Sequence, residues 1–110
     1  MTDSIVVLCT CASPEDGERL ARALVTGRLA ACASVVPNMR SIYRWKGEVE
    51  SADECLLLIK SSRRQFDELR EAIEKLHPYE IPEVLALPVV EGSPNYLAWM
   101  AASLSEGADE

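Results

Sequence analysis

The most chemically reactive side chains in this sequence are four cysteines and one histidine. The cysteines occupy positions 9, 11, 32 and 55, and His77 carries the only imidazole among the 110 residues. A nucleophile needs a base within reach, so Cys9 or Cys11 with His77 is the one candidate pair for covalent catalysis. No Cys-x-x-Cys pair is present, which argues against a zinc knuckle or a thioredoxin-type site.

No other motif favours an enzyme. The sequence has no Gly-rich phosphate loop, no G-x-S-x-G elbow and no second histidine for a hydrolytic metal centre. The four cysteines would allow two disulfides. However, Cys9, Cys32 and Cys55 lie in apolar, strand-like runs, where reduced cysteine behaves as a small apolar side chain. We therefore expect no catalytic residues, and thiols that stay reduced.

The histidine belongs to a stiff polar segment, LHPYEIPEV, at residues 76–84. Its two prolines restrict the backbone, and Tyr79, Glu80 and Glu83 follow His77 closely. Two interpretations remain open. The imidazole either hydrogen-bonds a backbone carbonyl and fixes the path of the chain, or it takes part in a binding site.

The composition is that of an ordinary globular domain. Hydrophobic residues make up 48% and charged residues 26% of the chain. The net charge of −7 argues against nucleic acid as a partner, because phosphate backbones require clustered Lys and Arg. No apolar run approaches the roughly 20 residues of a membrane helix, and residues 1–10 do not resemble a secretory signal. We expect one domain over 1–104, a flexible acidic tail at 105–110, and a cytoplasmic location.

Hydrophobic periodicity predicts the secondary structure. Strands are expected at 5–9, 29–36, 41–45, 48–59 and 84–90, and helices at 14–26, 66–76 and 94–104. Ser13-Pro14 and Ser93-Pro94 are signals for helix starts. Pro37-Asn38 predicts a bulge, and Lys46-Gly47 a two-residue hairpin turn. The inward faces of the last two helices are expected to carry Phe66, Leu69, Ile73 and Leu76, and Leu97, Met100, Ala101 and Leu104.

This order, β-α-β-β-α-β followed by a short C-terminal helix, predicts an α+β, ferredoxin-like fold. Its four strands form an antiparallel sheet in the order 4-1-3-2, with both main helices on one face. The end of the first strand then lies at the same edge of the sheet as the start of the last strand. We therefore expect Cys9, His77 and Glu83 at one end of the sheet, although they are far apart in the sequence.

The hairpin formed by the two middle strands is unusually long. Its two strands together span about 30 residues, so each runs well past the typical strand length of five or six residues. A four-stranded sheet leaves its outer part with bare edges and exposes Ile42, Tyr43 and Trp45. We expect this hairpin to pair with another copy of the chain, in a contact that can close into a ring. The alternative is a hairpin that bends back onto its own sheet.

Six segments, taken in order, resemble the CutA family of divalent-cation tolerance proteins. They are VVLCT at 6–10, LAACASVVP at 29–37, SIYRWKGEVE at 41–50, LLLIKS at 56–61, LHPYEIPEV at 76–84 and YLAWM at 96–100. The resemblance covers the chain from Val6 to about Leu104. It implies a ferredoxin-like homotrimer built through the long hairpin, similar in architecture to the PII signalling proteins. It also implies binding of copper and other divalent metals, with no established enzymatic activity.

Within this resemblance, Cys9 matches the cysteine linked with copper in some members, and His77 matches the histidine before Pro-Tyr. Some bacterial relatives have two adjacent histidines where this chain has Leu76-His77. Cys11 is an extra thiol on the same strand face as Cys9. Thiolate and imidazole suit copper and, less well, zinc, and Glu83 or Glu80 could add an oxygen ligand. The expected metal ligands are thus Cys9, His77 and Glu83, around a metal that folding does not require.

A second interpretation places a ligand in a cleft between subunits. The residues expected to line it are Tyr43, Trp45, Lys60, Tyr79 and Glu80. By analogy with the PII proteins, such a cleft would make the chain a trimeric sensor of a small anionic or zwitterionic molecule.

Overall fold

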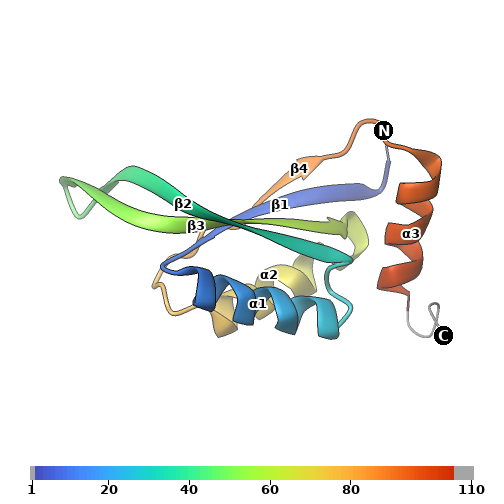
Figure 1. Cartoon of the computed structure of the whole chain (residues 1–110), viewed down its shortest axis with the longest axis horizontal. Coiled ribbons are helices and arrows are strands. Elements are labelled where there is room, and N and C mark those ends of the chain that lie inside the picture. The colour runs from blue at the N-terminus through green and yellow to red at the C-terminus, as the bar shows by residue number, and fades with distance from the viewer. Residues whose placement is uncertain (1, 106–110) are drawn as a thin grey trace.

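The computed structural model describes residues 2–105, and it has the expected ferredoxin-like arrangement (Figure 1). The elements are β1 (Ser4–Cys11), α1 (Pro14–Thr26), β2 (Cys32–Trp45), β3 (Glu48–Ser62), a 3-10 turn (Arg63–Gln65), α2 (Phe66–Leu76), β4 (Leu85–Pro88) and α3 (Pro94–Leu104). The strands form one antiparallel sheet in the order β2-β3-β1-β4. Both α1 and α2 cover the same face of it.

The core lies between the sheet and these two helices. Alternate side chains of β1 and β3 point toward the helices, as the two-residue period of a strand requires. The buried cluster comprises Ile5, Val7, Cys9, Cys11, Leu20, Leu24, Ala30, Cys55, Leu57, Ile59, Leu69 and Ile73. Three of the four cysteines thus lie in the core, and all four are free thiols.

The two predicted helix starts are confirmed. The Ser13 side chain accepts a hydrogen bond from the Asp16 N–H at 3.2 Å, and Pro14 is the first residue of α1. Ser93 caps α3 in the same way, by accepting from the Tyr96 N–H at 3.4 Å. In both cases a hydroxyl satisfies a backbone donor that the helix itself leaves unpaired.

Several boundaries differ from the expected ones. The first strand extends two residues further, to Cys11, and the second begins only at Cys32, because the preceding residues first close the end of α1. The last strand covers only Leu85–Pro88, although the Val89 N–H still bonds the Ser4 carbonyl at 3.1 Å. Leu76 is 55% exposed rather than inward-facing, because α2 ends there. Ala101 of α3 is also exposed, whereas Met100 and Leu104 are buried. Of the predicted acidic tail, residues 106–110 lie outside the described part of the chain.

The β2–β3 hairpin forms an arm that projects from the body of the molecule (Figure 1). Pairing between β1 and β3 ends at Cys11 and Cys55. From there to the hairpin turn, the arm consists of β2 and β3 alone and is only two strands wide. The turn has positive φ at Lys46 and Gly47, as a type I′ turn requires. The register shifts between Val36 and Met39, which confirms the bulge predicted at Pro37-Asn38.

The face of the sheet opposite α1 and α2 is apolar and uncovered in the single chain. Val36, Leu85 and Leu87 are 41–57% exposed there. The strand register places them in rows with half-buried leucines and valines: Val6, Leu8, Leu56 and Leu58. An apolar surface of this kind is typical of an interface with another protein surface.

Gly17 on α1 provides a test of how closely the helix packs on the sheet. A Cβ added there would lie 2.8 Å from the Cys55 Sγ. We expect Gly17→Ala to lower the free energy of unfolding by about 1–2 kcal/mol, because overpacking outweighs the better helix propensity of alanine. Urea unfolding at fixed protein concentration measures the change.

Gly27→Ala is the matched control, because its Cβ would meet only the Ala23 carbonyl oxygen, at 3.4 Å. We expect its effect to stay within about 0.5 kcal/mol. Removing the sulfur with Cys55→Ala should recover part of the loss caused by Gly17→Ala in a double-mutant cycle. Purely additive effects would contradict the proposed steric cause.

Candidate functional site

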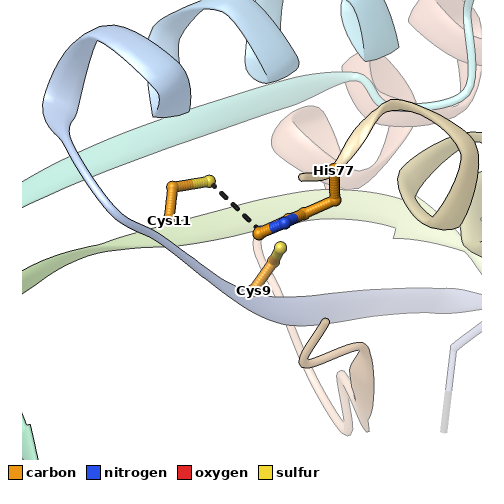
Figure 2. Close-up of side chains that lie close together, drawn as sticks. All are labelled: Cys9, Cys11 and His77. Carbon is orange, nitrogen blue, oxygen red and sulfur yellow. Dashed lines mark hydrogen bonds between the residues drawn. The ribbon is translucent and has the colours of Figure 1, made fainter. Parts of the chain in front are cut away.

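Three potential metal ligands meet at the end of β1 (Figure 2). The ligand atoms of Cys9, Cys11 and His77 all lie within 4.8 Å of one another, and all three residues are buried. The two cysteines share a face of β1 because they are two residues apart on a strand. His77 arrives from the other side of the core, as the residue that ends α2. Its N–H still bonds the Ile73 carbonyl at 2.8 Å, and its backbone is already extended ahead of Pro78.

Both ring nitrogens of His77 have hydrogen-bond partners. Nε2 donates to the carbonyl oxygen of Thr10 at 2.7 Å, and Nδ1 accepts from the Tyr79 N–H at 3.1 Å. A carbonyl can only accept and an amide N–H can only donate, so these partners hold the ring as the neutral tautomer with its proton on Nε2. The carbonyl-binding interpretation of His77 is therefore confirmed. The Cys11 Sγ lies 3.8 Å from the same Nε2.

The two thiols of the cluster differ in acidity. The hydrogen bond with Cys11 and the burial of the group raise the pKa of Cys9 far above its usual value. The same interaction with Cys9 lowers the pKa of Cys11 to about 7, and it outweighs the burial of Cys11, which acts in the opposite direction. Cys9 thus keeps its proton, and its Sγ lies 3.8 Å from the Thr10 carbonyl oxygen, which can accept it. Cys11 is the thiol that ionises first, and the thiolate is the reactive form of cysteine.

A small cavity gives access to only part of this cluster. Its volume is about 90 Å³, and its walls include Cys11, His77, Asp16 and Arg19 but not Cys9. Cys9 is completely buried, whereas Cys11 retains 2% exposure. A small solute that enters between α1 and the end of α2 therefore reaches Cys11 and His77 first.

A larger groove runs between the arm and residues 79–83. Its volume is about 640 Å³, and it is lined by Thr10, Ser41, Ile42, Tyr43, Trp45, Glu54, Tyr79, Glu80, Ile81, Pro82 and Glu83. The Tyr79 hydroxyl donates to Glu54 at 2.7 Å, and burial together with this bond raises the pKa of Tyr79, so the phenol stays protonated. Thr10 connects the two sites, because its carbonyl binds His77 and the residue lines the groove.

The structure brings together only some of the residues expected in each site. Cys9 and His77 meet, whereas Glu83 lines the groove and is not part of the cluster. Tyr43, Trp45, Tyr79 and Glu80 line one groove within the single chain. Lys60 is not among its lining residues. It pairs across the sheet with Cys32 and donates to the Cys32 Sγ at 3.4 Å.

Two contributing residues did not stand out in the sequence. Cys11 was placed on the same strand face as Cys9 from its spacing, but it was not among the expected metal ligands. Glu54 gives no local signal, because its contact with Tyr79 joins positions 25 residues apart. The groove lining contains three carboxylates but no Lys or Arg, so it offers no charged partner to an anion.

Two thiols and an imidazole are soft ligands of the kind that copper and zinc accept. Metal binding through Nε2 would require that nitrogen to lose its proton, and hence its bond to the Thr10 carbonyl. The residues therefore match a soft metal in type and spacing, and binding would rearrange His77 and displace protons.

Comparison with known proteins gives consistent matches along the chain. Residues 5–103 match the family described as "CutA1 divalent ion tolerance protein". The divalent-cation tolerance protein CutA of Thermus thermophilus is 50% identical over 95 residues, which cover 86% of this chain and 92% of that protein. The protein of the same name from Pectobacterium atrosepticum is 41% identical over 104 residues, covering 94% of each. The crystal structure of CutA from Xylella fastidiosa superposes with a TM-score of 0.92 at 36% identity, over 94% of this chain and all of that chain.

The acidity of Cys11 can be measured by thiol modification, as a mixed disulfide, in a Cys32→Ser background, which removes the most exposed thiol. Because the pKa of Cys11 is lowered to about 7, its thiolate forms as the pH rises through that value. We expect the rate of Cys11 modification by methyl methanethiosulfonate to reach half its plateau near pH 7, with Cys9 unmodified. Peptide mapping by mass spectrometry distinguishes the two sites.

The Cys9→Ala variant tests the cause of this acidity. Without the hydrogen bond from Cys9, the midpoint for Cys11 should rise toward the usual value for a cysteine, about 8.5. An unchanged midpoint in this variant, or a midpoint near 8.5 in the parent protein, would contradict the description of the thiol pair.

Proposed function

The chain belongs to the CutA1 divalent ion tolerance family, and on that premise we propose that it binds copper at the cluster of Cys9, Cys11 and His77. Its role in cation tolerance follows from the family. The observation that supports copper binding is the presence of three soft ligand atoms within 4.8 Å in a buried pocket. Thiolate and imidazole favour copper over harder divalent ions, with zinc as the less favoured choice.

The proposed order of contact follows from the access route. An arriving ion meets Cys11 and His77 at the 90 Å³ cavity, where the Cys11 thiolate is available near neutral pH. Cys9 lies beneath and completes the ligand set after losing its proton. Glu83, the third ligand expected from the sequence, is on the groove side, so the proposed third ligand is now a thiolate.

We also propose a homotrimer. Two features of the single chain support it, namely the uncovered apolar sheet face around Leu85 and Leu87 and the arm, whose Ile42 is 74% exposed. Both would be costly to leave in water, and a ring of three copies can cover both with one repeated contact.

A second candidate function is sensing of a small molecule, and the 640 Å³ groove favours it. A volume of this size falls within the range of small-molecule sites, and aromatic side chains with a few polar groups are their typical lining. In this proposal the chain is a PII-like trimer whose groove is completed by a neighbouring copy.

The remaining proposals concern what the protein does not do and where it acts. We propose that it is not an enzyme. The His77 Nε2 carries a proton and donates it to the Thr10 carbonyl, so this nitrogen is not free to accept a proton from the Cys11 thiol, as a catalytic base would. Nucleic acid and membranes are not proposed as partners, and the cytoplasm is the proposed location. No helix described within residues 2–105 is long and apolar enough to cross a membrane.

Copper binding can be tested by anaerobic titration of the reduced protein with Cu(I) in competition with a chromophoric chelator. We expect one Cu(I) per chain and a loss of affinity of about 100-fold or more in Cys11→Ser, because losing a ligand should exceed the 10–100-fold effect of losing an outer-shell partner. Cys32→Ser removes a thiol that is remote from the cluster and should bind as the parent does. Equal binding by Cys11→Ser and the parent would refute the proposed site.

The trimer can be tested by size-exclusion chromatography with light scattering. We expect the parent protein to have three times the chain mass of 12.1 kDa. Leu85→Glu should shift it toward the monomer, because it places a charge on the proposed contact face. Val25→Glu changes a similarly apolar exposed residue on the helix side and should stay trimeric. A parent protein that elutes as a 12.1 kDa species at micromolar concentration would rule out the assembly.

A further inference from the structure

The groove beside the arm has an unusual combination of side chains for an empty surface. Three aromatic rings and three carboxylates line it: Tyr43, Trp45 and Tyr79, with Glu54, Glu80 and Glu83. The other lining residues are uncharged. The groove therefore has a negative charge and several π faces, and it contains no cation of its own.

The negative charge of the groove is not compensated by an ion pair among the described residues. Among residues 2–105, Glu80 and Glu83 take part in no ion pair. Glu54 accepts a hydrogen bond from the Tyr79 hydroxyl, an uncharged donor, so this partner brings no positive charge to the groove. Glu54 and Glu83 are partly buried, whereas Glu80 is exposed. Charges of one sign that line a concave site attract a ligand of the opposite sign.

One of the three aromatic side chains is held in position by other groups of the chain. Tyr79 is fixed by its bond to Glu54 and by contact with the His77 ring, at 4.5 Å between centroids. Trp45 stands on the arm, and the Lys46 ammonium lies 5.8 Å from the centre of its ring. The tryptophan face thus already attracts a cation from outside the groove, and fixed aromatic faces bind ligand cations in the same way.

We propose that this groove binds a small organic cation, of the quaternary ammonium or alkylammonium class. Carboxylates would neutralise its charge, while the rings would contact its alkyl groups and attract the positive centre. An inorganic divalent ion would use the carboxylates but gain little from three aromatic walls, because hard cations select oxygen ligands. An anion would meet only repulsion. The inference rests on the second candidate function, a groove that binds small molecules, and it specifies the class of ligand.

Choline and its uncharged carbon isostere, 3,3-dimethylbutan-1-ol, provide the direct test. The chain has only two tryptophans, so a Trp99→Phe variant leaves Trp45 as the single reporter in the groove. We expect choline to change the Trp45 emission in a saturable way and to bind at least fivefold more tightly than the isostere. That ratio corresponds to a cation–π and charge contribution of about 1 kcal/mol. Sodium chloride at matched ionic strength controls for screening.

Charge-neutral variants identify the residues responsible. Glu80→Gln and Glu83→Gln should each weaken choline binding about three- to tenfold and leave the isostere unaffected. Glu71→Gln, on the exposed surface of α2, is the matched control and should bind as the parent does. Circular dichroism and the size of the assembly should be unchanged in all three, so a general structural defect cannot account for the pattern.

The possible failures are distinguishable. Equal affinity for choline and the isostere, or equal effects of Glu71→Gln and Glu83→Gln, would overturn the assignment of a cation site. Tighter binding of an anion such as adenosine monophosphate would overturn the ligand class but keep the small-molecule candidate. No response to any of these compounds, as expected if a neighbouring copy fills the groove, would overturn both. The copper proposal depends on different residues and is tested independently.

Discussion

The double hydrogen bond of His77 is the interaction on which both candidate sites depend. Its Nε2–H binds the Thr10 carbonyl, and its Nδ1 accepts from the Tyr79 N–H, so one neutral ring joins the end of β1 to the segment that follows α2. The ring is 7% exposed, and leaving either partner unpaired in such a place costs about 1–3 kcal/mol. This bond sets the distance from the imidazole to the two thiols on one side. On the other side it directs Tyr79 into the groove.

The same constraint makes the two sites chemically different although they lie close together. On the helix side, burial and the hydrogen bond between Cys9 and Cys11 separate their acidities, so a single thiolate forms next to the imidazole. On the groove side, carboxylates and aromatic rings line the surface, and Tyr79 is held by its bond to Glu54. The soft ligands are thus concentrated in the buried core on the helix side, and the hard, charged groups lie in the groove. Thr10, which binds His77 through its carbonyl and also lines the groove, connects the proposed copper ligands to the proposed cation site.

A second constraint on the structure comes from the apolar surface of the sheet. One face is closed by α1 and α2, while the other carries rows of valine and leucine that the chain does not cover itself. The arm has the corresponding problem at its edges, because β1 stops pairing at Cys55 and leaves the outer strands without neighbours. Val49, on the arm, is 66% exposed. A repeated contact between copies would resolve both problems and would also close the groove from the open side.

The sequence by itself determined the features that local physics controls. Serine and proline set the starts of α1 and α3, Lys46-Gly47 set the hairpin turn, and strand periodicity placed Cys9 and Cys11 on one face. The order of elements also brought Cys9 and His77 to one edge. Only the tertiary structure decided that Glu83 faces the groove, that Lys60 bonds Cys32 instead, and that Glu54 holds Tyr79. These outcomes depend on the pairing register and on the path of the Pro-containing loop, which join residues far apart in the chain and leave no periodic signal in it.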